Sequence, residues 1–274
     1  MPELPEVETV RRKLEQVIIK KTISSVDVRV PSMIRTSDVE TFCAALVQMT
    51  IMQMERRGKH LLFRLNDSHY LVSHLRMEGK YHYYDEPIPE RTKHDHIVFR
   101  FADGSELRYH DVRKFGTMDL VKKEELLTIS ALAELGLEPM DPAATATYLH
   151  NKLSSKRVVI KNALLDQRIL AGLGNIYVDE VLHASGIHPE RTASSITLKE
   201  ADTLLYHSAR ILTLAIEQGG ASVRSYNSLG EQGNMQQLLH VYARENLPCT
   251  KCETLINKIK VSGRGTHFCP TCQH

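Results

Sequence analysis

Four cysteines near the C-terminus are spaced as the ligands of a metal ion. Cys249, Cys252, Cys269 and Cys272 form the pattern C-x2-C-x16-C-x2-C, which can bring two thiolates from each of two turns onto one tetrahedral zinc ion. Two chance CxxC pairs or a disulfide pair are the alternatives. Because four protein ligands leave no open position for a catalytic water, we predict one structural zinc.

Arg264 lies between the two cysteine pairs, at the turn of a predicted β-hairpin. An alternating segment at 256–261 leads into the turn SGRG, and the segment THF follows it, a pattern typical of a hairpin. Gly263 and Gly265 flank the arginine and allow the backbone to approach another surface closely, so the guanidinium can reach an anion. A solvated turn residue is the alternative interpretation.

The amino terminus, MPELPEVETV, combines a helix start with two residues that the helix does not require. Pro5 suits the first helical position, and Glu6 and Glu8 suit the positive end of the helix dipole. Pro2 and Glu3 precede the predicted helix, where other residues would serve equally well. These two residues therefore need a chemical explanation.

The segment AGLGN at 171–175 is a tight glycine turn before a predicted helix. It is not a dinucleotide-binding fingerprint, because the third glycine would fall at Tyr177 and a preceding strand is missing from the pattern. The free N–H groups of the helix start, with the Asn175 side chain, could hold a phosphate. A plain turn with Asn175 as the helix cap is the alternative.

Composition limits the class of protein. The chain has 274 residues, of which 42% are hydrophobic and 25% are charged, so we expect two or three globular domains. No segment approaches the ~20 apolar residues of a membrane span, and the acidic start is unlike a signal peptide, so we expect a cytoplasmic protein with reduced cysteines. Cys43, outside the quartet, is predicted to be a small buried residue.

Charge alone does not identify a nucleic-acid partner. The net charge is +2, too small to predict DNA binding without local clustering. Basic clusters do occur in the segments RRGK at 56–59, RYHDVRK at 108–114 and SSKR at 154–157. These clusters are where an anionic partner is expected.

The pattern of elements changes along the chain. Short β-prone runs predict a strand-rich first part, at 60–65, 70–75, 96–101, 106–110 and 117–121. From about residue 131 the pattern becomes helical, with helices predicted over 156–167, from Asn175 to Gly186, and from Thr197, with Glu200 completing a capping box, to Gly219–Gly220. An α+β chain of several domains is expected.

Taken together, these motifs resemble the bacterial formamidopyrimidine-DNA glycosylases, in order and over nearly the whole chain. The segments that carry the resemblance are PELPEVET, RRGK, SHLRMEGKY at 73–81, DVRKFGT at 111–117, AGLGNIYVDE at 171–180 and GRGTHFCPTCQ at 263–273. The resemblance implies an N-terminal β-sandwich catalytic domain over 1–130, a linker over 131–150, a helix-two-turn-helix domain with a lesion-capping loop over 151–235, and a zinc finger over 236–274.

The resemblance also implies a reaction at Pro2. Removal of Met1 would expose a secondary amine with a pKa of about 8, which is nucleophilic at neutral pH. Attack on C1′ of a damaged nucleoside would expel the base and leave a cationic iminium, which promotes β- and then δ-elimination of the flanking phosphates. Glu3 matches the family's proton donor, Lys59 its β-elimination and phosphate residue, and Arg264 its δ-elimination residue.

Other positions match DNA contacts of the family. A phosphate contact is implied for Asn175, and DNA contacts are implied for His94, Arg113 and Arg157. Wedge residues that fill the space of an extruded base are implied for Met77, Arg113 and Phe115. The segment 219–235 is expected to cap the flipped base. The implied substrate is duplex DNA with oxidised purines such as 8-oxoguanine and formamidopyrimidines, and the implied enzyme is a monomeric glycosylase and abasic-site lyase.

Three alternative functions are also compatible with parts of the sequence. An endonuclease VIII-like glycosylase would prefer oxidised pyrimidines, and a zinc-ribbon DNA-binding protein would lack catalysis. An N-terminal-proline tautomerase would use Pro2 but would give no reason for the cysteine quartet or the basic clusters.

Overall fold

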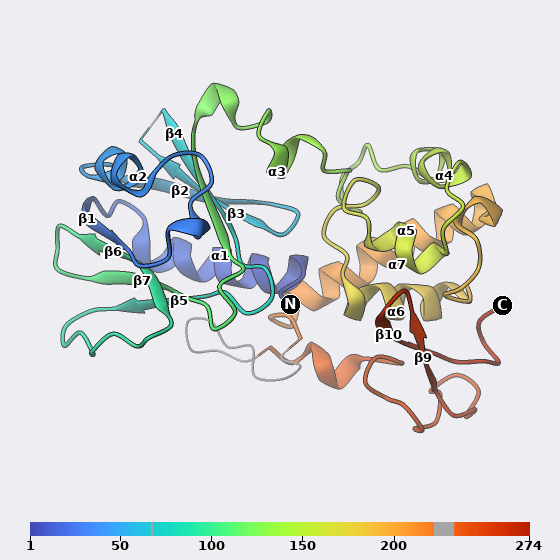
Figure 1. Cartoon of the computed structure of the whole chain (residues 1–274). Helices are drawn as coiled ribbons and strands as arrows, with labels where there is room; N and C mark the ends of the chain where they lie inside the picture. The colour runs from blue at the N-terminus through green and yellow to red at the C-terminus, as the bar shows by residue number, and fades with distance from the viewer. Residues whose placement is uncertain (67, 222–232) are drawn as a thin grey trace. The chain divides into compact units, whose positions relative to one another are not determined.

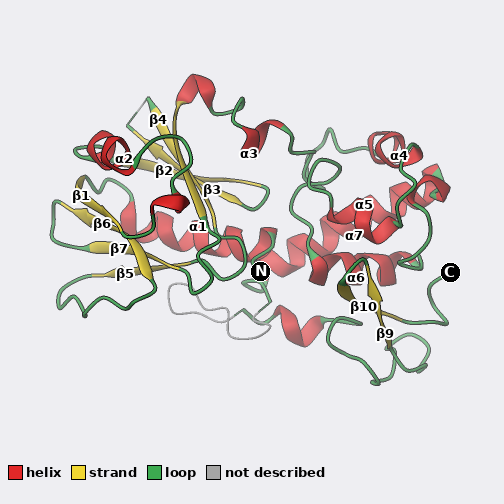
Figure 2. Cartoon of the chain, in the orientation of Figure 1, coloured by secondary structure: helices red, strands yellow, loops and turns green. Residues whose placement is uncertain are grey.

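The computed structural model describes residues 1–66, 68–221 and 233–274. The chain divides into two compact units, which we call the N-terminal unit, Met1–Ala133, and the C-terminal unit, Glu134–Ala221 with Asn234–His274. Figure 2 shows that strands dominate the first unit and helices the second. Most of the expected capping segment at 219–235 lies outside the described residues, and the four-part division of the chain stays a prediction.

Two antiparallel four-stranded sheets form the N-terminal unit (Figure 1). In spatial order, the first sheet consists of β2 (Ile51–Arg57), β3 (His60–Leu65), β4 (His69–His74) and β8 (Thr117–Lys122). The second consists of β1 (Ile23–Val28), β6 (Asp95–Phe101), β7 (Glu106–His110) and β5 (Lys80–Tyr84). The strands predicted from β-prone runs are all present.

Apolar side chains from both sheets meet in one core. The ring of Phe63 in β3 lies 5.7 Å from that of Tyr81 in β5, and Tyr81 lies 5.3 Å from Tyr109 in β7. All three are buried, in a cluster with residues such as Leu71 and Ile97. Face-to-face packing of two antiparallel sheets confirms the predicted β-sandwich.

Two longer helices flank these sheets. α1 (Leu4–Ile18) buries an apolar face that includes Val7, Val10 and Leu14, and α2 (Val39–Leu46) is capped by Asp38. Arg11 Nη1 donates a hydrogen bond of 3.1 Å to the carbonyl oxygen of Met54, which ties α1 to β2. Shorter helices in this unit are η1 (Pro31–Met33), η2 (Lys123–Glu125) and α3 (Ser130–Ala133).

Helices build most of the C-terminal unit. They are α4 (Ala146–Ser154), α5 (Ile160–Leu165), α6 (Asn175–Ser185), η3 (Ala193–Ser195), α7 (Leu198–Glu217) and η4 (Met235–Leu238). The capping box of Thr197 and Glu200 at the start of α7 is confirmed. α4 begins at Ala146, inside the segment expected to be a linker.

One helix prediction and one cap assignment in this unit are wrong, whereas the helix predicted from Asn175 to Gly186 is confirmed as α6. The helix predicted over 156–167 is confined to α5, because Val159 is extended and forms a β-bridge with Thr192. Asn175 is the first helical residue of α6 rather than its cap, and Gly174 takes the cap position. The Asn175 side chain is therefore available for contacts outside its own helix.

The C-terminal unit ends in the predicted β-hairpin. β9 (Asn257–Val261) and β10 (Arg264–Phe268) pair antiparallel, with Val261 opposite Arg264. The turn between them contains Gly263, whose φ of 83° is in the left-handed region that favours glycine.

No helix among the described residues is long and apolar enough to cross a membrane.

Candidate active site and zinc centre

The start of α1 holds Pro2 and Glu3 in a buried position. Glu3 is the N-cap of the helix and is 2% exposed, and Pro2 before it is also buried. The Glu3 backbone N–H donates to Glu6 Oε2 at 2.8 Å, and the Val7 N–H donates to the Glu3 carbonyl at 3.1 Å. The Pro2 nitrogen therefore sits at the positive end of a helix that is anchored in the core.

The RRGK turn brings Lys59 into the same unit, between β2 and β3. Gly58 has a φ of 56°, a left-handed conformation that glycine adopts without a steric penalty. Arg56 donates from Nη1 to the Gly58 carbonyl at 2.9 Å and from Nε to Glu8 Oε2 at 3.0 Å. Glu8 belongs to α1, so one guanidinium links the turn that precedes Lys59 to the helix that carries Pro2. Lys59 itself is 5% exposed.

Glu8 is ionised in this position. Its burial opposes ionisation, but hydrogen bonds from Arg11 and Arg12 and the charge of Arg56 lower the pKa of Glu8 below its ordinary value. Three guanidinium groups share this carboxylate, and their hydrogen bonds hold it in one position on α1. The link between α1 and the RRGK turn is consequently present at neutral pH.

Two buried histidines lie close to Lys59, although sequence reasoning did not select them. The register of β3 and β4 pairs His60 with His74, and their rings meet edge to face at 4.4 Å. Burial lowers the pKa of His60 to about 4 and that of His74 well below its ordinary value, with further lowering from the nearby cations of Arg76, Lys59 and Arg35. Both imidazoles are neutral at pH 7.

A hydrogen bond to His74 fixes the tautomer of its ring. The Arg76 backbone N–H donates to His74 Nδ1 at 2.9 Å, so the ring proton of the neutral imidazole is on Nε2. A neutral N–H donor next to Lys59, Arg76 and Arg35 is suited to an anionic oxygen. The β3–β4 register places His74 opposite His60, and no motif in the sequence indicated this pairing.

Two of the three predicted wedge residues are large apolar side chains on the surface. Met77 is 38% exposed and Phe115 is 52% exposed. The Arg113 guanidinium lies 4.8 Å from the centre of the Phe115 ring, a cation–π arrangement. The buried Asp111 carboxylate accepts N–H groups of Arg113, Phe115 and Gly116, each at 2.9 Å. The loop with Arg113 and Phe115 is therefore rigidly shaped even though its side chains are exposed.

Both wedge loops pack against one tyrosine. A Cβ atom added to Gly116 would lie 1.7 Å from Tyr109 Oη, and one added to Gly79 would lie 2.1 Å from the same oxygen. Only glycine permits this approach of the backbone at either position. Tyr109 consequently sets the separation of the loops that carry Met77 and Phe115.

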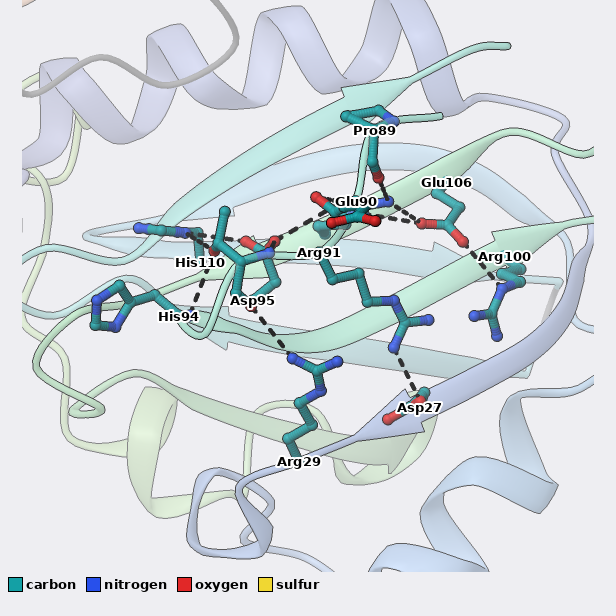
Figure 3. A network of polar contacts seen from close by, with 12 residues as sticks. Asp27, Arg29, Pro89, Glu90, Arg91, His94, Asp95, Arg100, Glu106 and His110 are labelled. Carbon is teal, nitrogen blue, oxygen red and sulfur yellow. Dashed lines mark hydrogen bonds and ion pairs between the residues drawn. The ribbon is translucent and has the colours of Figure 1, made fainter. Parts of the chain in front are cut away.

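His94 follows a loop that a polar network holds in place (Figure 3). The buried Asp95 carboxylate accepts the Thr92 N–H at 2.8 Å and lies 2.9 Å from His110 Nδ1. Burial acts against ionisation of Asp95, but the His110 and Thr92 hydrogen bonds lower its pKa. The buried Arg108 guanidinium donates to the carbonyls of Pro89 at 2.7 Å and Glu90 at 3.3 Å. The loop before His94 is thus anchored to β6 and β7.

The other predicted DNA contacts lie in the C-terminal unit. Arg157 is exposed between α4 and α5, and Arg264 is exposed at the hairpin turn. Asn175 Nδ2 donates to the Gly265 carbonyl at 3.0 Å, next to Arg264. The structure thus brings Asn175 and Arg264, which are far apart in the sequence, to the same place within this unit.

The four cysteines of the quartet converge. Their Sγ atoms all lie within 4.8 Å of one another, with Cys252 and Cys269 at 3.4 Å and Cys249 and Cys272 at 3.9 Å. A tetrahedral zinc with Zn–S bonds of about 2.3 Å requires S···S separations of about 3.8 Å. The residues present therefore fit one structural zinc. Cys43 is half-buried against the N-terminal core and takes no part.

Comparison with known proteins covers the whole chain. Residues 1–118 match the formamidopyrimidine-DNA glycosylase N-terminal domain, residues 135–227 its H2TH domain, and residues 246–274 the zinc finger found in FPG and IleRS. The formamidopyrimidine-DNA glycosylases of Exiguobacterium sibiricum and Shouchella clausii are 54% and 55% identical, each over 100% of this chain and 99% of the relative.

Solved structures agree with the sequence relatives. Wild-type Lactococcus lactis Fpg in complex with a DNA containing N7-benzyl-Fapy-dG is 44% identical, with a TM-score of 0.93 and full coverage of both chains. The same bacterium's Fpg in complex with abasic-site DNA is 43% identical, with a TM-score of 0.93 over 99% of both chains.

Proposed function

Because this chain belongs to the formamidopyrimidine-DNA glycosylase family, and is therefore a DNA-binding glycosylase and abasic-site lyase of base-excision repair, we propose that it removes oxidised purines from duplex DNA. The substrates are 8-oxoguanine and formamidopyrimidines. The names of the relatives and the Fapy-dG complex of the Lactococcus lactis enzyme support this choice over the oxidised pyrimidines of the endonuclease VIII branch. The enzyme acts as a monomer in the cytoplasm.

One observation carries the mechanism: Pro2 directly precedes the buried N-cap of α1. At the positive end of the helix dipole an ammonium is disfavoured, so the amine keeps its lone pair available. Met1 has to be removed first, because an amide nitrogen has delocalised its lone pair and is not a nucleophile. Met1 is 53% exposed and hence accessible to processing.

The proposed reaction begins with attack by the Pro2 amine. The Pro2 nitrogen attacks C1′ while the C1′–N bond to the damaged base breaks, and the sugar ring opens to give an iminium. The departing base and the ring oxygen each need a proton, and Glu3, buried beside the amine, delivers both, one its own and one that it receives from the amine as the iminium forms. Loss of a 2′ proton expels the 3′ phosphate, and a second elimination expels the 5′ phosphate. Water then hydrolyses the iminium and releases the amine.

Cations and wedge residues complete the proposal. Lys59 and Arg264 act on the leaving phosphates, while Asn175, His94, Arg113 and Arg157 bind the DNA backbone. Like Lys59, His74 donates a hydrogen bond to a phosphate, through its Nε2–H group. Met77, Arg113 and Phe115 occupy the space that the extruded base leaves in the duplex, since exposed apolar side chains stabilise a kinked, unstacked step.

The decisive experiment traps the intermediate. Purified enzyme whose amino terminus has been sequenced is mixed with an 8-oxoguanine:C duplex and borohydride, and the attached peptide is identified by mass. We expect the adduct on Pro2, and a matched preparation that retains Met1 should bind the duplex but form no adduct. An adduct from the preparation that retains Met1 would contradict the assignment of Pro2 as the nucleophile, and Lys59 would then be the next amine to test. Equal excision of oxidised pyrimidines would overturn the substrate class.

A further inference from the structure

The hairpin turn with Arg264 lies far from the zinc ion that stabilises the finger. Cys269 follows β10 directly, whereas Arg264 is the first residue of that strand, five residues earlier. At the rise of an extended chain this separation is about 17 Å. A two-stranded ribbon is marginally stable in water, so the zinc alone does not hold the turn in one position.

A buried ion pair from two helices contacts the strand beside the turn. Lys161 of α5 and Asp179 of α6 lie 2.6 Å apart, and both side chains are 0% exposed. Lys161 Nζ also donates to Thr266 Oγ1 at 2.8 Å and to the Gly265 carbonyl at 3.2 Å. The other oxygen of Asp179 accepts the His267 N–H at 2.9 Å. The pair thereby holds three consecutive residues of β10.

Two asparagines hold the chain on either side of Arg264. Asn175, one helical turn before Asp179 on α6, donates to the Gly265 carbonyl at 3.0 Å. Asn162, the neighbour of Lys161 in the sequence, donates to Ser262 Oγ at 2.6 Å. The residues on both sides of Arg264 are therefore fixed, although its own side chain is exposed.

The cost of burying two charges indicates a role other than packing. Replacing such a pair by apolar residues of similar volume is often neutral or even stabilising. Apolar side chains, however, cannot bond to the Gly265 carbonyl, the Thr266 hydroxyl or the His267 N–H. Thr266 Oγ1 donates in turn to the Arg264 carbonyl at 3.1 Å, so the pair is connected to the backbone of Arg264 itself.

We propose that Lys161 and Asp179 are positioning residues that hold the Arg264 guanidinium against the 5′ phosphate for the second, δ-elimination step. This inference rests on the role of Arg264 in the proposed function. The Pro2 amine and Lys59 belong to the N-terminal unit, so the glycosylase step and β-elimination do not depend on the ion pair. Its loss should therefore change the ratio of products rather than abolish the reaction.

The test removes the pair while keeping its volume. In K161M/D179L both charges are replaced together, so no uncompensated charge is left buried. Single-turnover reactions on an abasic-site duplex are resolved into the β-elimination product, with a 3′ unsaturated aldehyde, and the β,δ-elimination product, with a 3′ phosphate. We expect the δ-elimination rate to fall between about tenfold and a hundredfold, as for a misplaced catalytic group, with borohydride trapping and zinc content unchanged.

Three further variants sharpen the test. Thr266→Val removes the hydroxyl between Lys161 and the Arg264 carbonyl and should lower the δ-elimination rate less than the double variant does. Thr266→Ser keeps the hydroxyl and should restore it. Lys258→Met removes an exposed lysine of β9, paired with Glu245 at 3.0 Å, and should leave the product ratio unchanged.

Arg264→Ala, assayed in parallel, distinguishes a failure of the positioning role of the ion pair from a failure of the proposed role of Arg264. If Arg264→Ala stops at the β-elimination product while K161M/D179L gives the wild-type ratio, the positioning role is wrong and the role of Arg264 stands. If Arg264→Ala itself gives the wild-type ratio, the proposed role of Arg264 fails and the inference fails with it. Loss of zinc or of trapping by K161M/D179L would assign the pair to folding and would also overturn the inference.

Discussion

The N-terminal unit and the zinc finger position the residues of the proposed reaction by different physical means. In the first, Pro2, Glu3 and Lys59 are buried in a unit whose core contains more than twenty apolar side chains, contributed mainly by the two sheets, α1 and α2. In the second, the apolar cluster consists of Val241, Cys249, Ile256 and Cys269 with two partly buried cysteines. A segment with so small a core depends on its metal and on polar contacts.

In the proposed reaction, the steps at Pro2 and Lys59 and the step at Arg264 are therefore sensitive to different structural changes. Pro2 and Lys59 should respond to changes in apolar packing and to the protonation of buried histidines. Arg264 should respond to zinc removal and to the Lys161–Asp179 pair.

Zinc removal should have the largest effect. Binding of a structural zinc contributes about 10–16 kcal/mol of folding free energy in small fingers, so Cys269→Ser or a strong chelator should unfold residues 246–274. DNA affinity should fall about a hundredfold or more as charged hydrogen bonds to phosphates are lost. Zinc analysis, hydrogen exchange and DNA titration measure these effects. If strands β2–β8 lost protection from exchange together with the finger, the separation of the two halves would be wrong.

A core truncation should produce the reverse pattern. Phe63 is 1% exposed and packs on Tyr81 between the sheets, so Phe63→Ala should destabilise the N-terminal unit by about 3–5 kcal/mol. The protein should still bind one equivalent of zinc. Denaturant unfolding followed with a zinc-release assay measures both quantities, and simultaneous zinc release at the shifted midpoint would contradict the comparison.

Acid should weaken the N-terminal unit through His60. His60 has a pKa of about 4 in the folded protein, below the value of about 6.5 expected when unfolded. As the pH falls, His60 therefore binds a proton in the unfolded chain before it does so in the folded protein. Its contribution to the free energy of unfolding is fully present above pH 6.5 and is lost as the pH drops toward 4. Below pH 4 this contribution changes no further. The loss amounts to about 3 kcal/mol. His60→Gln should flatten the stability profile between these pH values, and an unaltered slope would exclude His60 as its source.

The wedge substitutions should have the smallest effect. Phe115→Ala and Met77→Ala should slow excision of 8-oxoguanine from duplex DNA by about tenfold, because an extruded base needs a side chain in its place and the unstacking energy is a few kcal/mol. Cleavage at an abasic site that is already exposed should change less. Both side chains are exposed, so thermal stability should hardly change. Equal losses on both substrates would indicate damage to the fold instead of loss of the wedge.

Motifs whose members are close in the sequence were predictable. The cysteine pairs, the hairpin turn around Gly263 and the capping box of Thr197 each depend on residues a few positions apart, and the structure contains all three. The strands of the sandwich were likewise predictable, since β-prone composition and turn residues act locally.

Contacts between distant segments were decided by the tertiary structure. His74 joins His60 only through the strand register, and Val159 leaves the predicted helix because Thr192 pairs with its backbone. Lys161 and Asp179 look like ordinary solvated charges on two helices, and nothing in their spacing predicts that β10 will cover them. Local propensity amounts to less than about 1 kcal/mol per residue, whereas burial of a charge or a backbone group is worth several, so these positions were determined by the packed chain.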